Sequence, residues 1–400
     1  MPTMSVPEQE IDEAAIDKWN EEQEVLDDEA VPGKEDPGSK YADSQLRVVR
    51  ETRDYQLDYI RHALQPGREL INIAPSYQRR LRWDKRKRSL LIESFLLNIP
   101  VPPIFLYEED YNVFEVIDGR QRLDTIRSFL ANDFALRGLE YWPELDEHRF
   151  NDIPKVLQSG LLRRSLQAVV LLAETRDSGA EGIDVRRVLF DRLNTGGEKL
   201  NPQELRNALY PGRLNQALIQ LARSDLFADA WGIPRFTKSE LEEPPASLVA
   251  NPIYAKLADA ELVLRVFALR DAIENDRRGS LRTILDRYMA EKADVSEPER
   301  QAMKAEFESS LRWLADAFGA DLFRLPTGRL SRPLYDALMI ARMSLPTSGV
   351  TVAAPEAVRR TLAAALDDVD QYEILVGRGN TIGSVRERVN LAGSVLTEGG

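Results

Sequence analysis

The feature that most constrains the fold is a change of hydrophobic pattern near residue 210. Before it, short apolar runs typical of buried strands alternate with runs whose apolar residues recur every three or four positions. From about 210 to 375, almost only the helical pattern remains. The sequence therefore predicts an α+β protein, in which a mixed α/β domain (44–210) precedes an all-α domain (211–400). A length of 400 residues agrees with two domains.

Residues 1–43 are predicted to form an acidic, disordered tail. They carry 14 Asp and Glu against three Lys, which accounts for most of the net charge of −13. The rest of the chain is nearly neutral and contains basic patches, so the net charge does not exclude nucleic acid as a partner. Ile11, Ile16 and Trp19 are weak anchors for a short acidic helix. Two interpretations stay open: a solvated tail, or an autoinhibitory or partner-binding segment that mimics nucleic-acid charge.

Several classes of site are disfavoured by what the sequence lacks. The chain has no cysteine, which rules out disulfides, a thiolate nucleophile and cysteine-ligated metals. Its two histidines, His62 and His148, do not neighbour the polar motifs described below, so a histidine-based HNH nuclease centre or a Ser-His-Asp triad has little support. No GxxxxGK[ST] motif marks a P-loop. With neither a bilayer-spanning apolar run nor a signal peptide, we expect a cytoplasmic protein without a membrane partner.

Local signals place the expected elements along the chain. Asp84 is expected to cap a helix over 85–98, and Asn201 to cap another, with Pro202 at its first position and Glu204 completing a capping box. The other expected elements are a helix over 46–64, strands over 69–75, 104–109, 111–118 and 166–174, and helical patterns over 259–273 and 355–375.

The stretch "VFEVIDGRQRLDTIRSFL" (113–130) predicts a strand, a tight turn and a helix with Leu123, Ile126, Phe129 and Leu130 on one face. A glycine permits the turn, and the start of the helix offers unpaired N–H groups to an anion. Arginines suit phosphate oxygens because their donors are forked and always charged. The aspartate at this corner could orient an arginine, bind Mg²⁺ or cap the helix, and an ordinary salt-bridged turn remains the alternative.

A second candidate is the basic segment "PSYQRRLRWDKRKR" (75–88), in which Tyr77 and Trp83 interrupt a run of cations. This pattern is typical of a phosphate-binding surface with aromatic platforms. The alternative is a solvated helical face with Trp83 packed in the core. The residues expected to contact nucleic acid are Arg80, Arg82, Lys85, Arg86, Lys87 and Arg88.

A third candidate is the polar turn in "FDRLNTGGEKLNPQELRNA" (190–208). Asn194 and Thr195 precede two glycines that break the helical pattern. A plain connection between two helices explains the turn equally well.

Together these motifs resemble the GmrSD-type restriction endonuclease N-terminal domain family, a branch of the ParB/sulfiredoxin-like fold. The resemblance covers about residues 68–212. The family hallmark is Asp-Gly-Gln-Gln-Arg, and this chain has Asp118-Gly119-Arg120-Gln121-Arg122, where Arg120 adds positive charge in place of a glutamine. The segments that carry the resemblance are "PSYQRRLRWD", "IESFLLNIPVPPIFLYEE", "VIDGRQRLDTIRSFL" and "LFDRLNTGGEKLNPQELRNALYPG".

The resemblance implies a nucleoside triphosphate held near Gly119, Gln121 and Arg122. Further nucleotide contacts are expected from Tyr77, Gln78, Arg79 and Asn194.

Catalytic roles are assigned to Asp118, Arg120 and Arg122, with Asp118 also as a ligand of Mg²⁺. No residue can be named as the base that activates water, although Glu115 and Asp124 are near in sequence.

The resemblance further implies a role in DNA restriction or anti-phage defence, as a sensor or regulatory subunit. Family members commonly add an HNH-like nuclease domain, which the histidine count does not support here. We therefore expect a Mg²⁺-dependent nucleoside triphosphate hydrolase that works on DNA with a separate nuclease or defence subunit. Its alternatives are a non-enzymatic nucleic-acid-binding module gated by the acidic tail, and a metal-dependent DNA nickase. A homo-oligomer stays open.

Overall fold

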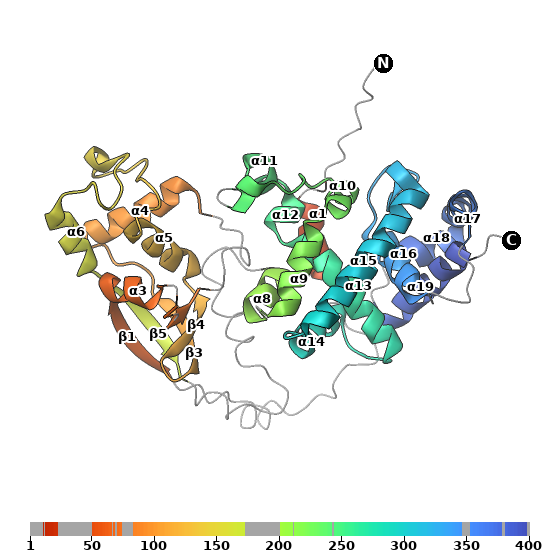
Figure 1. Ribbon diagram of the computed structural model, residues 1–400, viewed down its shortest axis with the longest axis horizontal. Helices are drawn as coiled ribbons and strands as arrows, with labels where there is room; N and C mark the ends of the chain where they lie inside the picture. Colours follow the sequence, from red (N-terminus) through yellow and green to blue (C-terminus); the bar gives the residue numbers. More distant parts are fainter. Residues whose placement is uncertain are drawn as a thin grey trace, which may run out of the picture. The chain divides into compact units, whose positions relative to one another are not determined.

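The computed structural model describes residues 11, 13–22, 50–65, 67–68, 70–73, 83–172, 201–210, 212–241, 244–345, 353–377 and 381–397. The chain divides into two compact units. The sheet unit lies within Gly33–Leu200, and the helical unit combines Met1–Pro32 with Asn201–Gly400. Figure 1 shows strands in the first and helices throughout the second. The predicted α+β class is confirmed.

The sheet unit is built on a mixed five-stranded sheet with the order β1-β5-β3-β4-β2. β1 is antiparallel to β5, β5 parallel to β3, β3 antiparallel to β4, and β4 parallel to β2. This topology matters for function because it brings the start of β3 beside the end of β4. The strands are β1 (Arg50–Gln56), β2 (Ile71–Asn72), β3 (Ile104–Asp110), β4 (Val113–Asp118) and β5 (Ser165–Leu171).

Helices of the sheet unit lie on one side of its strands (Figure 1). On α5 (Arg120–Leu130), the predicted apolar face is buried, with Leu123, Ile126 and Phe129 fully covered. Asp84 begins α4 as predicted, because its carboxylate accepts the Lys87 N–H at 2.7 Å. The other helices are α3 (Leu57–Ala63), α4 (Lys85–Leu96), α6 (Lys155–Leu162) and the 3₁₀ helix η4 (Pro143–Leu145).

The prediction of one helix over 46–64 is wrong for residues 50–56. These residues form strand β1, and α3 begins only at Leu57. Exposed and half-buried residues alternate along β1, as they do in an edge strand with one face toward the protein. Its Arg, Glu and Gln residues are good helix formers, but pairing with β5 far along the chain overrides that local preference.

The helical unit surrounds α13 (Ala258–Glu274), which is buried along most of its length. The helical pattern over 355–375 comprises two helices, because Asp368 accepts the Gln371 N–H at 2.9 Å and starts a new one. The remaining helices are α8 (Pro202–Leu209), α9 (Arg213–Ala222), α10 (Asp225–Trp231), η7 (Lys238–Leu241), α11 (Ala246–Val249), α12 (Pro252–Ala255), α14 (Leu281–Glu291), α15 (Glu297–Phe318), η8 (Gly319–Asp321), α16 (Arg332–Ser344), α17 (Pro355–Asp367), α18 (Val369–Val376) and α19 (Ile382–Thr397).

Helix α8 belongs to the helical unit, which begins at Asn201 rather than after residue 210. Its predicted capping box is present: Asn201 accepts the Glu204 N–H, and Glu204 accepts the Asn201 N–H, each at 2.9 Å. Arg206 then joins α8 to α14 through Asp286 at 2.7 Å. This arginine is only 1% exposed, so the contact between α8 and α14 is buried.

Helix α1 (Glu13–Glu21) lies within the segment predicted as a tail. Ile16 is 1% exposed in the core of the helical unit, and Ile11 and Trp19 pack against that core. The expectation of a solvated tail is therefore wrong for this helix, whereas the three anchors named from the sequence do make its contacts.

Along the described ranges, no helix combines the length and apolar character that a membrane crossing requires.

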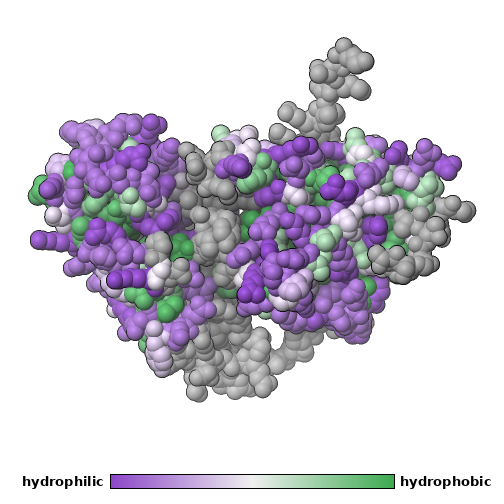
Figure 2. All heavy atoms as spheres, viewed as in Figure 1, coloured by the Kyte–Doolittle hydropathy of each residue, from purple (hydrophilic) through white to green (hydrophobic). Residues whose placement is uncertain are grey.

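The face of the molecule in Figure 2 is mostly hydrophilic, with apolar side chains in small groups. Most large apolar side chains lie instead in two buried clusters, one in each unit.

Candidate functional site

The turn between β4 and α5 requires a glycine. Gly119 has φ 94° and ψ 11°, a left-handed conformation that side chains disfavour. A Cβ placed there would lie 2.2 Å from Cγ2 of Ile104, which is fully buried at the start of β3. Both the left-handed backbone conformation and the close packing against Ile104 therefore require glycine at this turn.

A β-bulge lies at the same corner. Phe105 pairs with Asp118, but Leu106 pairs with Val116, which leaves Ile117 as an extra residue in β4. Bulges bend a strand and re-aim the side chains beside them, and they are frequent next to functional sites. Here the bulge immediately precedes the polar residues of the predicted motif.

Asp118 and Arg122 form an ion pair across this turn, with 2.7 Å between Nη2 of Arg122 and Oδ2 of Asp118. The same Nη2 lies 3.3 Å from the carbonyl oxygen of Pro103, so Arg122 joins the end of β4 to the start of β3. The Asp118 side chain is 33% exposed and that of Arg122 is 14% exposed. The pair is thus open to solvent on one side.

The corner retains unused polar atoms that suit a nucleotide. Nε of Arg122 and Oε1 of Gln121 are buried without a hydrogen-bond partner in the described part of the chain. The first turn of α5 contains no acidic residue, and Asp118, just before the turn, is already paired with Arg122. An arginine fork, a helix N-terminus and an adjacent carboxylate form a donor set that fits a phosphate with Mg²⁺.

Other charged residues near the corner have structural partners. Arg120 is only 6% exposed. Asp124 is also buried and pairs with Arg127 at 2.7 Å and with Arg88 at 3.8 Å. This carboxylate is therefore engaged by two cations, which makes it a poor candidate for the base that activates water.

The predicted basic surface divides at Arg88. Lys85, Arg86 and Lys87 are exposed in the first turn of α4, directly after the Asp84 cap. The Arg88 guanidinium instead lies 4.3 Å from the Phe134 ring centre, and burial lowers its pKa from the usual range despite the charge of Asp124. Arg88 thus faces the interior and is not part of the exposed basic turn, Lys85–Lys87.

A comparison with protein families decides the assignment. The family described as GmrSD restriction endonuclease, N-terminal domain, matches residues 60–211. Residues 60–211 are similar to the GmrSD N-terminal domain. The resemblance drawn from the motifs is confirmed, and the domain indicates involvement in restriction or anti-phage defence and interaction with DNA. Comparisons with curated proteins and with solved structures gave no match.

The matched range extends beyond the sheet unit. It takes in both the Asp118–Arg122 corner and α8, the first helix of the helical unit after Leu200. Six predicted site residues of the GmrSD N-terminal domain lie outside the described residues, and their roles stay predictions: Tyr77, Gln78, Arg79, Arg80, Arg82 and Asn194.

A rigid loop beside the basic turn was not predicted from the sequence. Every backbone N–H from Arg137 to Trp142 donates to a side chain: Ser89 accepts the first, Asp146 the next two, and Glu93 the last three. Ser89 and Glu93 lie one turn apart on α4 and are almost fully buried. The loop is thereby fixed to the helix that carries the basic turn, and Arg86 pairs with Glu140 at 2.8 Å.

A metal centre made by protein ligands alone is not found among the described residues, where no group of three acidic or histidine side chains gathers. Mg²⁺ bound with a nucleotide needs fewer protein ligands, because phosphates and waters supply the rest. Asp118 fits this role, since its Oδ1 has no partner within the described ranges.

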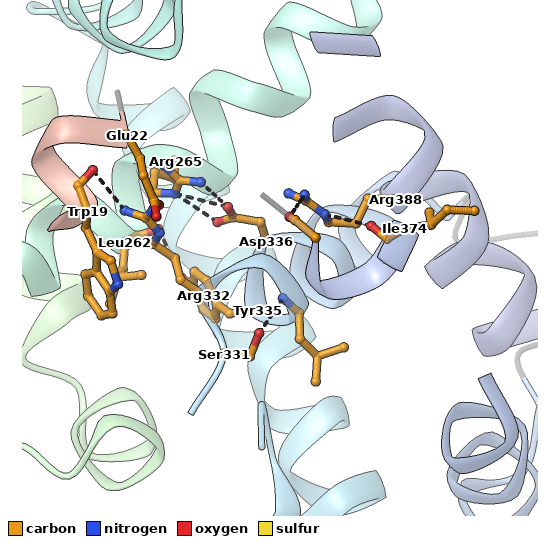
Figure 3. A network of polar contacts seen from close by, with 12 residues as sticks. Trp19, Glu22, Leu262, Arg265, Ser331, Arg332, Tyr335, Asp336, Ile374 and Arg388 are labelled. Atoms are coloured by element: carbon orange, nitrogen blue, oxygen red, sulfur yellow. Dashed lines mark hydrogen bonds and ion pairs between the residues drawn. The ribbon is translucent and has the colours of Figure 1, made fainter. Parts of the chain in front are cut away.

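The helical unit contains a buried charge network, shown in Figure 3. Arg265 donates from Nε to both oxygens of Asp336 at 3.1 Å, and the two side chains are 1% and 0% exposed. Burial, the largest influence, lowers the pKa of Arg265, but Asp336 outweighs it and the net pKa is above the usual value. A lone arginine in the apolar pattern "LVLRVF" was the sequence signal for such a pair.

Proposed function

We propose that the Asp118–Arg122 corner binds the phosphates of a nucleoside triphosphate together with Mg²⁺, in a protein of DNA restriction or anti-phage defence. The observation that carries the proposal is the half-open Arg122–Asp118 pair beside a helix whose first turn contains no acidic residue. A phosphate can take over the arginine there, since one face of the pair already meets solvent.

Each residue of the corner has a distinct task in this proposal. Arg122 binds phosphate oxygens through its guanidinium and keeps its contact with the Pro103 carbonyl. Asp118 holds Mg²⁺ directly or through water, and the metal offsets phosphate charge. Gly119 keeps the helix start at its observed place against Ile104. Gln121 offers its buried carbonyl oxygen as an acceptor to the ribose or base.

Calorimetry with a panel of nucleoside triphosphates and Mg²⁺ tests this proposal. Arg122→Ala should abolish binding while circular dichroism and the melting temperature show a folded protein. The matched control is Arg127→Ala, because Arg127 is also on α5 and also pairs with an aspartate at 2.7 Å. Unchanged affinity in Arg122→Ala, or an equal loss in both variants, contradicts the proposal. Phosphate release in the same samples, with and without DNA, reports hydrolysis.

We also propose that the exposed basic turn, Lys85–Lys87, contacts the phosphate backbone of DNA. Three exposed cations follow one another at the positive end of the α4 dipole, where the nearby carboxylates are the Asp84 cap and Glu140, which pairs with Arg86. The cations outnumber these carboxylates, so a DNA phosphate is electrostatically favourable at this surface. The loop fixed by Ser89 and Glu93 gives this surface a rigid edge.

DNA binding measured by fluorescence anisotropy over a range of salt concentrations tests the second proposal. Replacing Lys85, Arg86 and Lys87 by glutamine should weaken binding at every sequence, and the salt slope should fall by about 0.9 for each phosphate that the protein no longer neutralises. Lys155→Gln is the control, because Lys155 is a single exposed cation at the start of α6. An unchanged salt slope in the triple variant argues against this surface.

A further inference from the structure

Arg332 lies in the first turn of α16. Among the described residues, its guanidinium forms hydrogen bonds only with helix α1 and with Glu22, the residue that follows α1. Nη1 lies 3.5 Å from the Trp19 carbonyl oxygen and Nη2 lies 2.7 Å from Oε2 of Glu22. The Trp19 ring covers the guanidinium at 4.9 Å, and the arginine is 4% exposed (Figure 3). We call Arg332 and Trp231, which both contact the Trp19 ring, the Arg332 socket.

The socket is complementary to the end of an acidic helix. A helix C-terminus presents free carbonyls and the negative end of its dipole, and Arg332 meets both the Trp19 carbonyl and the Glu22 carboxylate there. The Trp19 ring also packs edge-on against Trp231, with 6.4 Å between ring centres. Tryptophan and glutamate three residues apart are therefore the features that the socket recognises.

Charge makes the socket dependent on its occupant. Burial above all, and then the neighbouring Arg265, lower the pKa of Arg332, and the net pKa is about 10 despite the opposing charges of Glu261, Asp336 and Glu22. Asp336 is already hydrogen-bonded to Arg265. Without Glu22, Arg332 would remain a buried cation with no hydrogen-bonded carboxylate, which is an unfavourable state. An empty socket therefore attracts another acidic group.

Helix α1 is itself held by few contacts. It has nine residues, which is too short for a helix that is stable alone in water. Of its described side chains, Ile16 is buried, and Trp19 is only partly covered. These few contacts must therefore offset the conformational entropy that residues 13–22 lose when α1 docks. Such a balance makes docking reversible, in contrast to α13 and α16 in the core.

We propose that α1 is a reversible latch in the Arg332 socket, and that an acidic helix of a partner protein with the same Trp-x-x-Glu end can replace it. The order of the chain gives the latch a consequence. The sheet unit is inserted between α1 and α8, so a docked α1 ties this unit to the helical unit at both of its ends. After release of α1, the sheet unit is joined to the helical unit only by the chain connection from Leu200 to Asn201.

Hydrogen exchange of the full-length chain, followed by mass spectrometry, tests the latch. Glu22→Gln should increase exchange of residues 13–22 at least tenfold and leave α13 unchanged. Glu21→Gln is the matched control: it removes the same charge from the adjacent, exposed residue. Equal exchange in the two variants overturns the proposal. Trp19→Ala should behave like Glu22→Gln, since it removes the other recognised group without altering the socket.

A labelled peptide of residues 11–22 tests the open socket in the full-length Glu22→Gln protein. It should bind there at least tenfold more tightly than to the wild-type chain, whose own α1 competes. The same peptide with glutamine at position 22 should bind at least tenfold more weakly, and with glutamine at position 21 equally well. Failure of the unchanged peptide to bind either protein contradicts replacement. A dimer that forms with concentration and disappears in Trp19→Ala assigns the socket to a second copy and overturns the latch.

Discussion

The two units each contain an Arg–Asp pair on which the surrounding structure depends, and the two pairs differ mainly in burial. Arg265 and Asp336 are sealed between α13 and α16, with side chains 1% and 0% exposed. Arg122 and Asp118 join a strand end to a helix start, with 14% and 33% exposed. A pair without access to solvent serves the fold alone, whereas a pair with one open side can exchange its partner for a ligand.

The two pairs can also be compared by the hydrogen-bond partners of their polar atoms. At the open pair, buried polar atoms of Gln121 and Arg122 lack partners in the described part of the chain. At the sealed pair, Asp336 accepts from Arg265 through both oxygens, although Nη1 of Arg265 also lacks a partner in that part of the chain. Unused polar atoms therefore occur at both pairs, and solvent access is what makes those of the open pair, the Arg122 donor and the Gln121 acceptor, candidates for binding a ligand.

Breaking the sealed pair should have the largest effect on stability. Asp336→Ala leaves Arg265 charged and buried, and we expect the helical unit to lose about 3–5 kcal/mol of unfolding free energy. Denaturant unfolding measures the loss, and hydrogen exchange should show it in α13 and α16 and not in β3 or β4. A loss below about 1 kcal/mol would mean that water reaches the arginine.

Gly119→Ala should have the next largest effect, in the sheet unit. A left-handed alanine costs about 1–2 kcal/mol, and the added methyl group meets Ile104 at 2.2 Å, which adds about 1–3 kcal/mol of overpacking.

The matched control for that substitution is Gly67→Ala. Gly67 has a similar φ of +86°, but no atom lies within 4 Å of the added group. Urea unfolding of both variants separates backbone strain from packing. Equal losses in the two variants would show that the contact with Ile104 relaxes.

Breaking the open pair should have a small effect on stability. Asp118→Ala leaves Arg122 with its Pro103 contact and partial solvation, so we expect a loss of about 1 kcal/mol or less. Calorimetry should nevertheless show weaker binding of nucleotide with Mg²⁺. A loss as large as that of Asp336→Ala would remove the distinction between the two pairs.

The pair of Arg300 and Glu297, with side chains 27% and 50% exposed, is the most exposed of the three pairs compared and should give the smallest effect. Hydrogen bonds from Arg300 and Gln301 lower the pKa of Glu297 to about 2 from an ordinary 4.5. A depressed pKa means that the carboxylate stabilises the folded state above pH 4.5 and loses this effect as the pH falls through 2. The melting temperatures of wild type and Glu297→Gln should therefore differ slightly at pH 7 and converge below pH 4.5. A constant difference would contradict the shift.

The candidate site could be predicted from the sequence only where it depends on neighbours along the chain. Gly119 and the strand-to-helix corner follow from a short pattern and are found as expected. The diversion of Arg88 toward Phe134 and Asp124 could not be foreseen, because its partners come from other elements. The loop fixed by Glu93 likewise depends on contacts across 47 to 49 positions.

What the sequence by itself determined is local: the caps at Asp84 and Asn201, the glycine turn, and the family motif. These rest on groups within a few residues, whose geometry the chain fixes wherever the segment lies. Tertiary structure alone decided that residues 50–56 form a strand, that α1 docks through Arg332, and that one Arg–Asp pair is sealed while the other is open. Pairing, burial and solvent access depend on distant segments, because only the assembled fold sets which charges water can reach.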